Sequence, residues 1–238
     1  MNVLIVHAHP EPQSFTAALR DATAEHFRAR GDRVTVSDLY AMGFNPVASA
    51  ADFGTRGNAE YMNYALEQRA NADAGTLAAD IQAELDKVIA ADLLVFTFPL
   101  YWFSVPAILK GWFDRVLVSG KAYGGRRIYD QGGFTGKRAM LTLTCGGREH
   151  MLSAGSIHGD IRDILKPVLQ GTLGYTGMTV LPPFVGYHIP YLQPEQRAGI
   201  LDDYRQHLAN LDQLEPLKMP VLAAFDREMR PLPSALEF

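Results

Sequence analysis

Two segments of the chain combine side chains that could bind an anion and a flat ring. Residues 9–16 read His-Pro-Glu-Pro-Gln-Ser-Phe-Thr, directly follow an apolar run and lead into a helix that Ser14 would open. Free backbone N–H groups and the helix dipole at such a start suit an anion, and a pyrophosphate fits there. His9 could add a further phosphate donor. Ser14 could equally serve only as the helix cap.

The second segment is a run of three adjacent aromatic residues. Tyr101, Trp102 and Phe103 follow an apolar run and precede a helix. Aromatic residues in a buried helical stripe would be three or four positions apart. Adjacent ones point in several directions, so at least one should be exposed or should line a cleft. A flat ring could stack there, although packing of the loop or a subunit interface would use the same residues.

A third segment, residues 144–147, reads Thr-Cys-Gly-Gly and ends another apolar run. Paired glycines let a backbone approach a ligand closely, or simply form a tight turn. Cys145 is the only cysteine, which excludes an intramolecular disulfide and a cluster of cysteine ligands. His7 and His9 would point the same way from a strand end, but no nearby cysteine or carboxylate cluster completes a metal site. No metal is expected.

These segments must be positioned by elements that alternate in type along the chain. Short apolar runs predict strands, and apolar residues repeated every three or four positions predict helices. The expected strands are 2–7, 33–39, 92–98, 138–144 and 178–187. The expected helices are 14–29, 79–91, 106–119, 157–173 and 194–214, with a long, weakly helical loop over 49–71.

The alternation predicts an α/β fold with helices on both faces of a parallel sheet. The turn after the first strand has no glycine, whereas the dinucleotide-binding fold expects Gly-x-Gly-x-x-Gly there. This favours a flavodoxin-like, doubly wound, five-stranded parallel sheet of order 2-1-3-4-5. The ligand crevice of that fold lies between strands one and three, whose carboxyl ends carry residues 9–16 and 98–103.

The chain has 238 residues and a formal net charge of −4, which argues against a dedicated nucleic-acid binder. Its first residues lack the positive region of a secretory signal, and a cytoplasmic location is expected. Residues 93–113 are apolar over the length of a membrane span, but Pro99 and Pro106 interrupt them, so no membrane insertion is expected. We expect one domain over 1–214 and a proline-rich extended arm over 215–238.

Together these segments resemble the NAD(P)H:quinone oxidoreductase family of flavodoxin-like flavoproteins over roughly residues 2–213. The most specific stretch is FPLYWFSVPAILKGWFDRVL, residues 98–117. The other matching segments are 9–15, 37–42, 44–46, 129–130, 144–147 and 157–160.

The resemblance implies a homodimeric enzyme that transfers hydride from NAD(P)H through FAD to quinones or similar electrophiles, in a two-electron, ping-pong mechanism. FMN is the less expected flavin. The implied cofactor contacts are His9, Ser14, Phe15, Thr16, Pro99, Leu100, Tyr101, Trp102, Phe103, Thr144, Cys145, Gly146, Gly147 and Arg197. In the family, nicotinamide and quinone share one pocket at the subunit interface, and Tyr123, Met151 and Tyr175 match its walls.

Two positions depart from the family pattern. Family members with a complete proton relay have a tyrosine and a histidine; His158 matches the histidine, but Leu152 stands where the tyrosine would be. Leucine has no hydroxyl, so His158 is the expected catalytic residue, acting alone or through water. Gly125 stands where some members have a second tyrosine, which implies a wider pocket.

Two other functions are compatible with the same residues. Some relatives are regulatory subunits of membrane transport systems, and such a role would leave the flavin site intact. A nitro- or azo-compound reductase would differ only in its electron acceptor. The sequence does not decide between NADH and NADPH.

Overall fold

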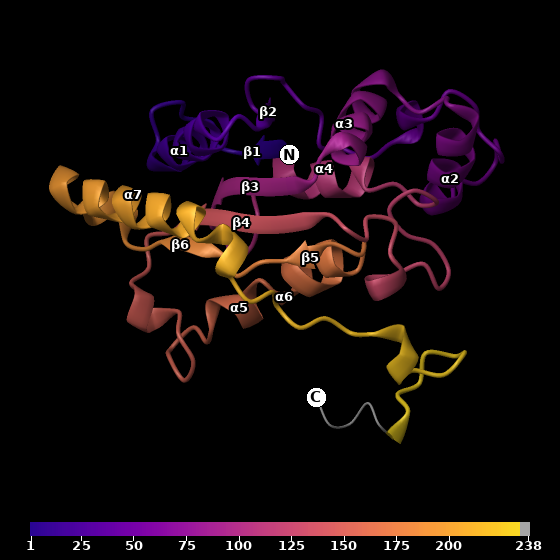
Figure 1. Ribbon diagram of the computed structural model, residues 1–238. Helices are drawn as coiled ribbons and strands as arrows, with labels where there is room; N and C mark the ends of the chain where they lie inside the picture. The colour runs from indigo at the N-terminus through magenta and orange to yellow at the C-terminus, as the bar shows by residue number, and fades with distance from the viewer. Residues whose placement is uncertain (234–238) are drawn as a thin grey trace.

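A parallel sheet forms the centre of the protein (Figure 1), in a computed structural model that describes residues 1–233. Its strands are β1 (Asn2–His7), β2 (Arg33–Asp38), β3 (Leu93–Pro99), β4 (Arg138–Thr144), β5 (Thr179–Val180) and β6 (Phe184–Gly186). They pair in parallel in the order β2-β1-β3-β4-β5, and β6 also pairs with β4. This confirms the flavodoxin-like fold predicted from the sequence.

The last strand differs from its prediction as one element over 178–187. β5 and β6 are separate, and Pro182 and Pro183 lie between them. Proline has no N–H to give to a ladder, so the pairing to β4 breaks there and resumes at Phe184. The expected fifth strand is therefore two short strands on the same edge of β4.

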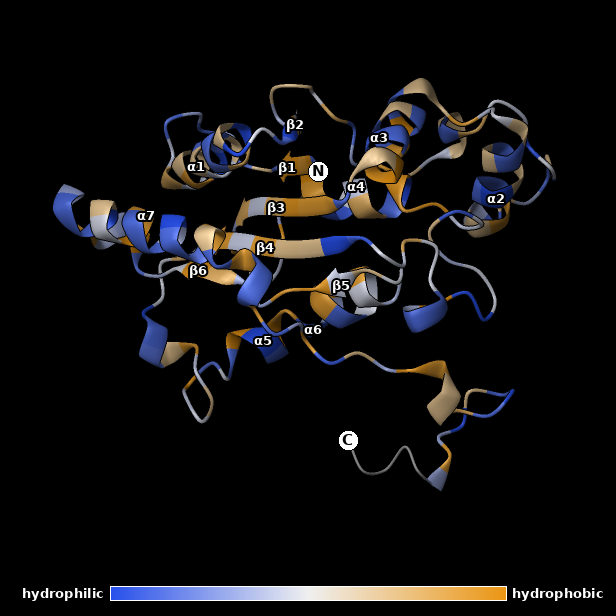
Figure 2. Cartoon of the chain, in the orientation of Figure 1, coloured by the Kyte–Doolittle hydropathy of each residue, from blue (hydrophilic) through white to orange (hydrophobic). Residues whose placement is uncertain are grey.

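Helices cover both faces of the sheet. One face is covered by α1 (Phe15–Ala29) and α7 (Pro194–Ala209), whose Phe27 and Tyr204 pack in one apolar cluster with Ile5 of β1. On the other face, α3 (Ala79–Ala90) and α4 (Ala107–Val116) pack against Leu4 and Val6 of the same strand. Because strand side chains alternate between the faces, one run of apolar residues supplies both cores. Figure 2 shows the hydrophobic colour on the central strands and the hydrophilic colour along α7.

Two expected elements take a different form. α2 (Tyr64–Ala74) begins inside the predicted loop 49–71 and extends beyond it; the Asn63 side chain caps it, and it ends at Gly75 in the left-handed region. The expected helix 157–173 begins only at residue 161 and consists of α5 (Ile161–Ile164), α6 (Lys166–Val168) and a π-helix (Leu169–Gly174). Pro167 lies inside that stretch and removes a backbone donor.

Residues 215–233 run along the outside of the sheet and its helices (Figure 1). Leu217 N donates to Val180 O at 2.8 Å, and Leu222 N donates to Asp130 Oδ1 at 2.8 Å. This segment forms a helical turn over Leu222–Ala224, and a bridge between Phe225 and Pro231 closes a hairpin. In the described part of the chain, no helix is long and apolar enough to cross a membrane.

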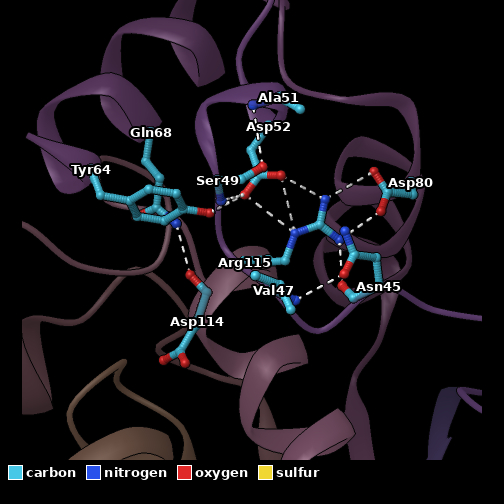
Figure 3. A network of polar contacts seen from close by, with 10 residues as sticks. All are labelled: Asn45, Val47, Ser49, Ala51, Asp52, Tyr64, Gln68, Asp80, Asp114 and Arg115. Atoms are coloured by element: carbon cyan, nitrogen blue, oxygen red, sulfur yellow. Dashed lines mark hydrogen bonds and ion pairs between the residues drawn. The ribbon is translucent and has the colours of Figure 1, made fainter. Parts of the chain in front are cut away.

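A buried ionic network joins α4 to the segment before α2 (Figure 3). Arg115 of α4 is 3% exposed and donates to Asp52, Asp80 and the carbonyl oxygen of Asn45 at 2.6–2.8 Å. Tyr64 of α2 donates to the other side of Asp52. Burial alone would raise the pKa of Asp52, but the hydrogen bonds from Arg115 and Tyr64 lower it below its ordinary value. The network therefore contains a buried, charged carboxylate.

His7 is a buried titratable group at the carboxyl end of β1. It is fully buried, and its Nδ1 lies 2.8 Å from the hydroxyl of Thr97. Its Nε2 has no hydrogen-bond partner among the described residues. Burial, followed by the nearby charge of Arg20, lowers the pKa of His7 from 6.5 to about 4. The folded protein therefore holds His7 in the neutral form at neutral pH.

This burial predicts a loss of stability in acid. Between pH 6.5 and about 4 the unfolded chain binds a proton at His7 that the folded chain does not. This difference in proton binding should lower the free energy of unfolding by about 1.4 kcal/mol for each pH unit within that window. His7 should contribute no further loss below about pH 4. Urea unfolding at pH 7.5 and 4.5 should show a loss about 2–3 kcal/mol smaller for His7→Gln than for the unaltered protein. Equal losses would show that His7 accepts a proton in the fold.

Candidate active site

A cleft opens at the carboxyl ends of β1, β3 and β4, the edge at which doubly wound folds bind ligands. It consists of two adjoining cavities of about 290 Å³ and 240 Å³ that share three residues, Leu100, Cys145 and Gly146. The first is lined by His9, Ser14, Phe15, Thr16, Pro99, Leu100, Tyr101, Thr144, Cys145, Gly146, Ile189 and Pro190. The second is lined by Leu100, Trp102, Phe103, Cys145, Gly146, Gly147, Leu152 and His158.

One end of the cleft is the start of α1. Ser14 caps the helix, and its side chain accepts from Ala17 N at 3.1 Å, so the capping role considered from the sequence is present. The remaining free N–H groups of the first turn and the helix dipole favour an anion. The Thr16 hydroxyl lies 2.8 Å from the hydroxyl of Thr144, which joins the helix start to the end of β4.

His9 can donate at the same end. Its Nδ1 accepts from Glu11 N at 3.0 Å. Burial lowers the pKa of His9 below its ordinary value, so the ring is neutral at neutral pH. The single proton of a neutral imidazole whose Nδ1 accepts must lie on Nε2. His9 therefore offers one N–H donor besides the backbone of α1.

The other end of the cleft is a strained aromatic turn. Tyr101 and Ser104 exchange two backbone hydrogen bonds of 3.0 Å, and the two residues between them have positive φ values, 49° at Trp102 and 58° at Phe103. The left-handed conformation costs about 1–2 kcal/mol at each non-glycine residue. Trp102 is also 95% exposed, so packing within the chain does not explain the turn. Strain of this kind is found where a residue must face a ligand or a partner.

The Thr-Cys-Gly-Gly segment forms the floor between the two ends. Leu100 N donates to Thr144 O at 2.8 Å, and Cys145 N donates to Gly186 O at 2.9 Å. The segment is therefore hydrogen-bonded to the chain on either side of β4, at the ends of β3 and β6. Burial raises the pKa of the Cys145 thiol, which keeps it protonated at neutral pH. At Gly146 an added Cβ would meet only the Tyr191 ring, at 3.7 Å. The backbone there is open to a ligand.

His158 stands at the aromatic end. Its ring is exposed, lies 5.3 Å from the Phe103 ring centroid to centroid, and faces the same cavity as Leu152. Its backbone N donates to Met151 O at 3.2 Å. Leu152, which stands where the resemblance implies a tyrosine, is 3% exposed and supplies an apolar surface to this cavity. Among the described residues that line this second cavity, which we call the aromatic cavity, His158 is the only histidine.

Four of the residues predicted for the site lie outside this cleft. Arg197 is on α7, and Met151 contacts His158 through its backbone without lining either cavity. Tyr123 and Tyr175 pair with ring centroids 5.6 Å apart and line a third cavity of about 480 Å³ that shares no residue with the cleft. One chain alone does not bring these tyrosines to His158.

Two lining residues, Ile189 and Pro190, were not predicted from the sequence. They follow β6, and loops after parallel strands share the ligand-binding edge, so their position in the topology was the available signal. Within residues 1–233, no three His, Cys, Asp or Glu side chains are grouped as a metal site requires.

The comparisons with known proteins agree with this architecture. The family described as having a flavodoxin-like fold matches residues 1–211. NAD(P)H dehydrogenase (quinone) 1 of Rattus norvegicus is 42% identical over 224 residues, which cover 94% of this chain and 82% of that protein. Ribosyldihydronicotinamide dehydrogenase (quinone) of Homo sapiens is 43% identical over 216 residues, covering 90% and 94%.

A solved structure from Klebsiella pneumoniae, assigned to the quinone reductases, superimposes with a TM-score of 0.87 and 39% identity. The match covers 99% of this chain and 93% of that one. The fold and the position of the cleft place the protein in the flavodoxin-like class. By these matches, the chain belongs to the NAD(P)H:quinone oxidoreductase family and is an enzyme.

Proposed function

We propose that this protein binds FAD in the cleft and uses it to transfer hydride from NAD(P)H to quinones or similar electrophilic acceptors. The observation that carries the proposal is that the two ends of the cleft offer different kinds of contact. One end offers the free N–H groups of α1 and the donor of His9, and the other offers the exposed rings of Trp102 and Phe103. A dinucleotide flavin has the matching parts, an anionic pyrophosphate and a flat ring system.

The residues of the cleft fit this cofactor. Backbone N–H groups at the start of α1 and His9 Nε2 would hold the pyrophosphate. Gly146 and Gly147 would let the backbone approach the ring, and the strained turn would place Trp102 and Phe103 beside it. FAD is favoured over FMN because FMN loops are rich in Ser, Thr and Gly, whereas residues 9–16 contain two prolines and no glycine.

Bound flavin would supply the hydride acceptor and donor, which no side chain of this protein can supply. The protein would position the ring, exclude water and stabilise charge. The apolar surface of Leu152 and the ring of Phe103 would keep the aromatic end dry. His158 would hold a proton against the negative charge that develops on the ring and exchange it with solvent, to which its imidazole is exposed.

A homodimer would complete the site. The Tyr123–Tyr175 pair forms an aromatic wall that faces a cavity of its own, apart from His158. In a dimer, the wall of one protomer can cover the cleft of its partner, which would also bury the exposed Trp102. Nicotinamide and quinone would then enter the same covered pocket in turn, which predicts ping-pong kinetics.

Steady-state kinetics with NADPH or NADH and a benzoquinone test the proposal. Parallel lines in double-reciprocal plots are expected, and intersecting lines would contradict a shared pocket.

Gly146→Val should abolish turnover while leaving the melting temperature within a few degrees, because the new methyl groups fill the cleft rather than the core. Gly199→Val, at an exposed position of α7, is the matched control and should keep full activity. An active Gly146→Val protein would place the reaction elsewhere.

A further inference from the structure

Three consecutive backbone carbonyls of the cleft floor are held by the turn that follows β6. Cys145 O accepts from Ile189 N at 3.1 Å, and Gly147 O accepts from His188 N at 2.9 Å. Between them, Gly146 O accepts from the imidazole Nδ1 of His188 at 3.0 Å. Because a carbonyl oxygen only accepts, the imidazole carries a proton on Nδ1. His188 and Ile189 thus hold all three carbonyls, and we call this pair the histidine corner.

The N–H groups of the same three peptide units are free. In a trans peptide the C=O and the N–H point in opposite directions, and the described residues contain no cis peptide bond. The carbonyl contacts therefore direct the N–H groups of Gly146, Gly147 and Arg148 away from the histidine corner. Within residues 1–233, none of these N–H groups donates a hydrogen bond to the protein. Gly146 and Gly147 line the cleft, so their N–H groups are available to a ligand there.

The central peptide, between Gly146 and Gly147, depends on a side chain. Among the described residues its carbonyl has one hydrogen-bond partner, the imidazole of His188. The carbonyls on either side of it are held by backbone N–H groups, which every residue except proline supplies. Neither glycine has a Cβ that would restrict rotation of the peptide plane, so the imidazole is the group that fixes it.

The conformation of His188 is unusual. Its φ of 58° and ψ of 20° lie in the left-handed region, which is unfavourable for a histidine. Tyr191 N donates to His188 O at 3.0 Å, and the Tyr191 ring lies 4.8 Å from the imidazole at an interplanar angle of 34°. The imidazole is therefore supported in place, although His188 lines neither cavity of the cleft. Backbone strain that the surrounding structure maintains in this way points to a functional role.

We propose that His188 is a positioning residue of the flavin site, which holds the Gly146–Gly147 peptide so that the Gly147 N–H donates to the ring of the bound flavin. This inference rests on the proposed function and adds to it a residue outside the cleft lining. A fixed N–H donor stabilises charge that develops on the ring better than a rotating one, because no reorganisation is needed. His158 would act on this charge with its own proton, and His188 through the backbone.

Three substitutions at this position separate the hydrogen-bond donor from the backbone conformation. His188→Asn keeps an N–H donor on a residue that tolerates the left-handed region. His188→Gly removes the donor and adopts that region freely. His188→Ala also removes the donor but leaves the backbone less free than glycine does. Because His188 is only half-buried, the melting temperatures of the three variants should agree within a few degrees.

The midpoint potential of the bound flavin, measured against reference dyes, should become more negative in His188→Ala and in His188→Gly. Reduction of the flavin by NADPH should slow by about tenfold in both, less than the hundredfold or more lost when an oxyanion donor is removed outright, since the unfixed peptide still samples the productive orientation. His188→Asn should keep the potential and most of the rate, because its side chain restores the donor.

An unaltered potential in both His188→Ala and His188→Gly would overturn the inference. A potential that falls only in His188→Gly would also overturn it, because the cause would then be backbone freedom. An equal fall in His188→Asn would assign the effect to the imidazole ring rather than to a donor, with the same consequence.

Heteronuclear NMR of the nitrogen-labelled protein, as purified, gives a readout that needs no turnover. The neutral imidazole of His188, whose signals are those lost in His188→Asn, should be protonated at Nδ1. The Gly147 amide should give one sharp signal in the unaltered protein and in His188→Asn, and a broadened signal in His188→Gly. Protonation at Nε2, or a Gly147 signal that is the same in all variants, would overturn the inference even where FAD is bound. If the unaltered protein binds no flavin, the proposed function fails, and the NMR signals then decide whether His188 fixes this peptide.

Discussion

Arg115→Met is expected to lower the free energy of unfolding by about 3–5 kcal/mol at pH 7, the range for a buried ion pair that loses one partner. The substitution removes the hydrogen bonds to Asp52, Asp80 and the Asn45 carbonyl, and leaves a carboxylate that is 1% exposed without its cation. The hydroxyl of Tyr64 and a backbone N–H remain with Asp52, but neither carries charge. Urea unfolding followed by circular dichroism measures the loss.

The exposed pair Lys110–Asp114 on the same helix is the matched control. Its ammonium and carboxylate lie 2.6 Å apart, yet both side chains are about half exposed. Lys110→Met should therefore cost less than about 1 kcal/mol. Similar losses for Arg115→Met and Lys110→Met would mean that burial of the Asp52 network does not set its contribution.

His158→Ala is expected to slow the reductive half-reaction by about ten- to a hundredfold, at the low end of general acid–base effects. In the proposed site, His158 is the only imidazole lining the aromatic cavity, and Leu152 has no hydroxyl with which to replace it. The KM for NAD(P)H should change little, because the proposed role of His158 is to stabilise developing charge rather than to bind the co-substrate. Stopped-flow reduction of the flavin-loaded protein by NADPH gives the rate directly.

His150 provides the matched control for that substitution. It is an exposed histidine in the short helix Glu149–Met151, outside both cavities of the cleft. His150→Ala should leave the rate unaltered. A His158→Ala protein that is reduced as fast as the unaltered one would assign charge stabilisation to backbone N–H groups or to water instead.

The sheet was predictable because each of its buried strands is a short apolar run bounded by polar residues. β1, β3 and β4 are such runs, and the order of the sheet followed from a turn without glycine after β1. The elements that differed depend on single residues. Pro182 and Pro183 divide the last strand, and the Asn63 cap stabilises α2 where the apolar pattern was weak.

The cleft was partly predictable for a related reason. Ser14, Thr16, Trp102 and Phe103 lie in the segments that connect predicted strands to the next helices, so the topology alone places them at one edge. The features that could not be derived from the sequence depend on which residues, distant in the chain, lie near one another in the fold. The separation of the two-tyrosine wall from His158 emerges only when segments distant in the chain are placed together.

Identification of the flavin in the purified protein tests the central claim most directly. The protein should have a flavin spectrum, and acid release followed by chromatography should give FAD at one molecule per chain. FMN in its place would contradict the assignment of a pyrophosphate to the start of α1. A protein that holds no flavin, even after incubation with FAD, would contradict the proposed function itself.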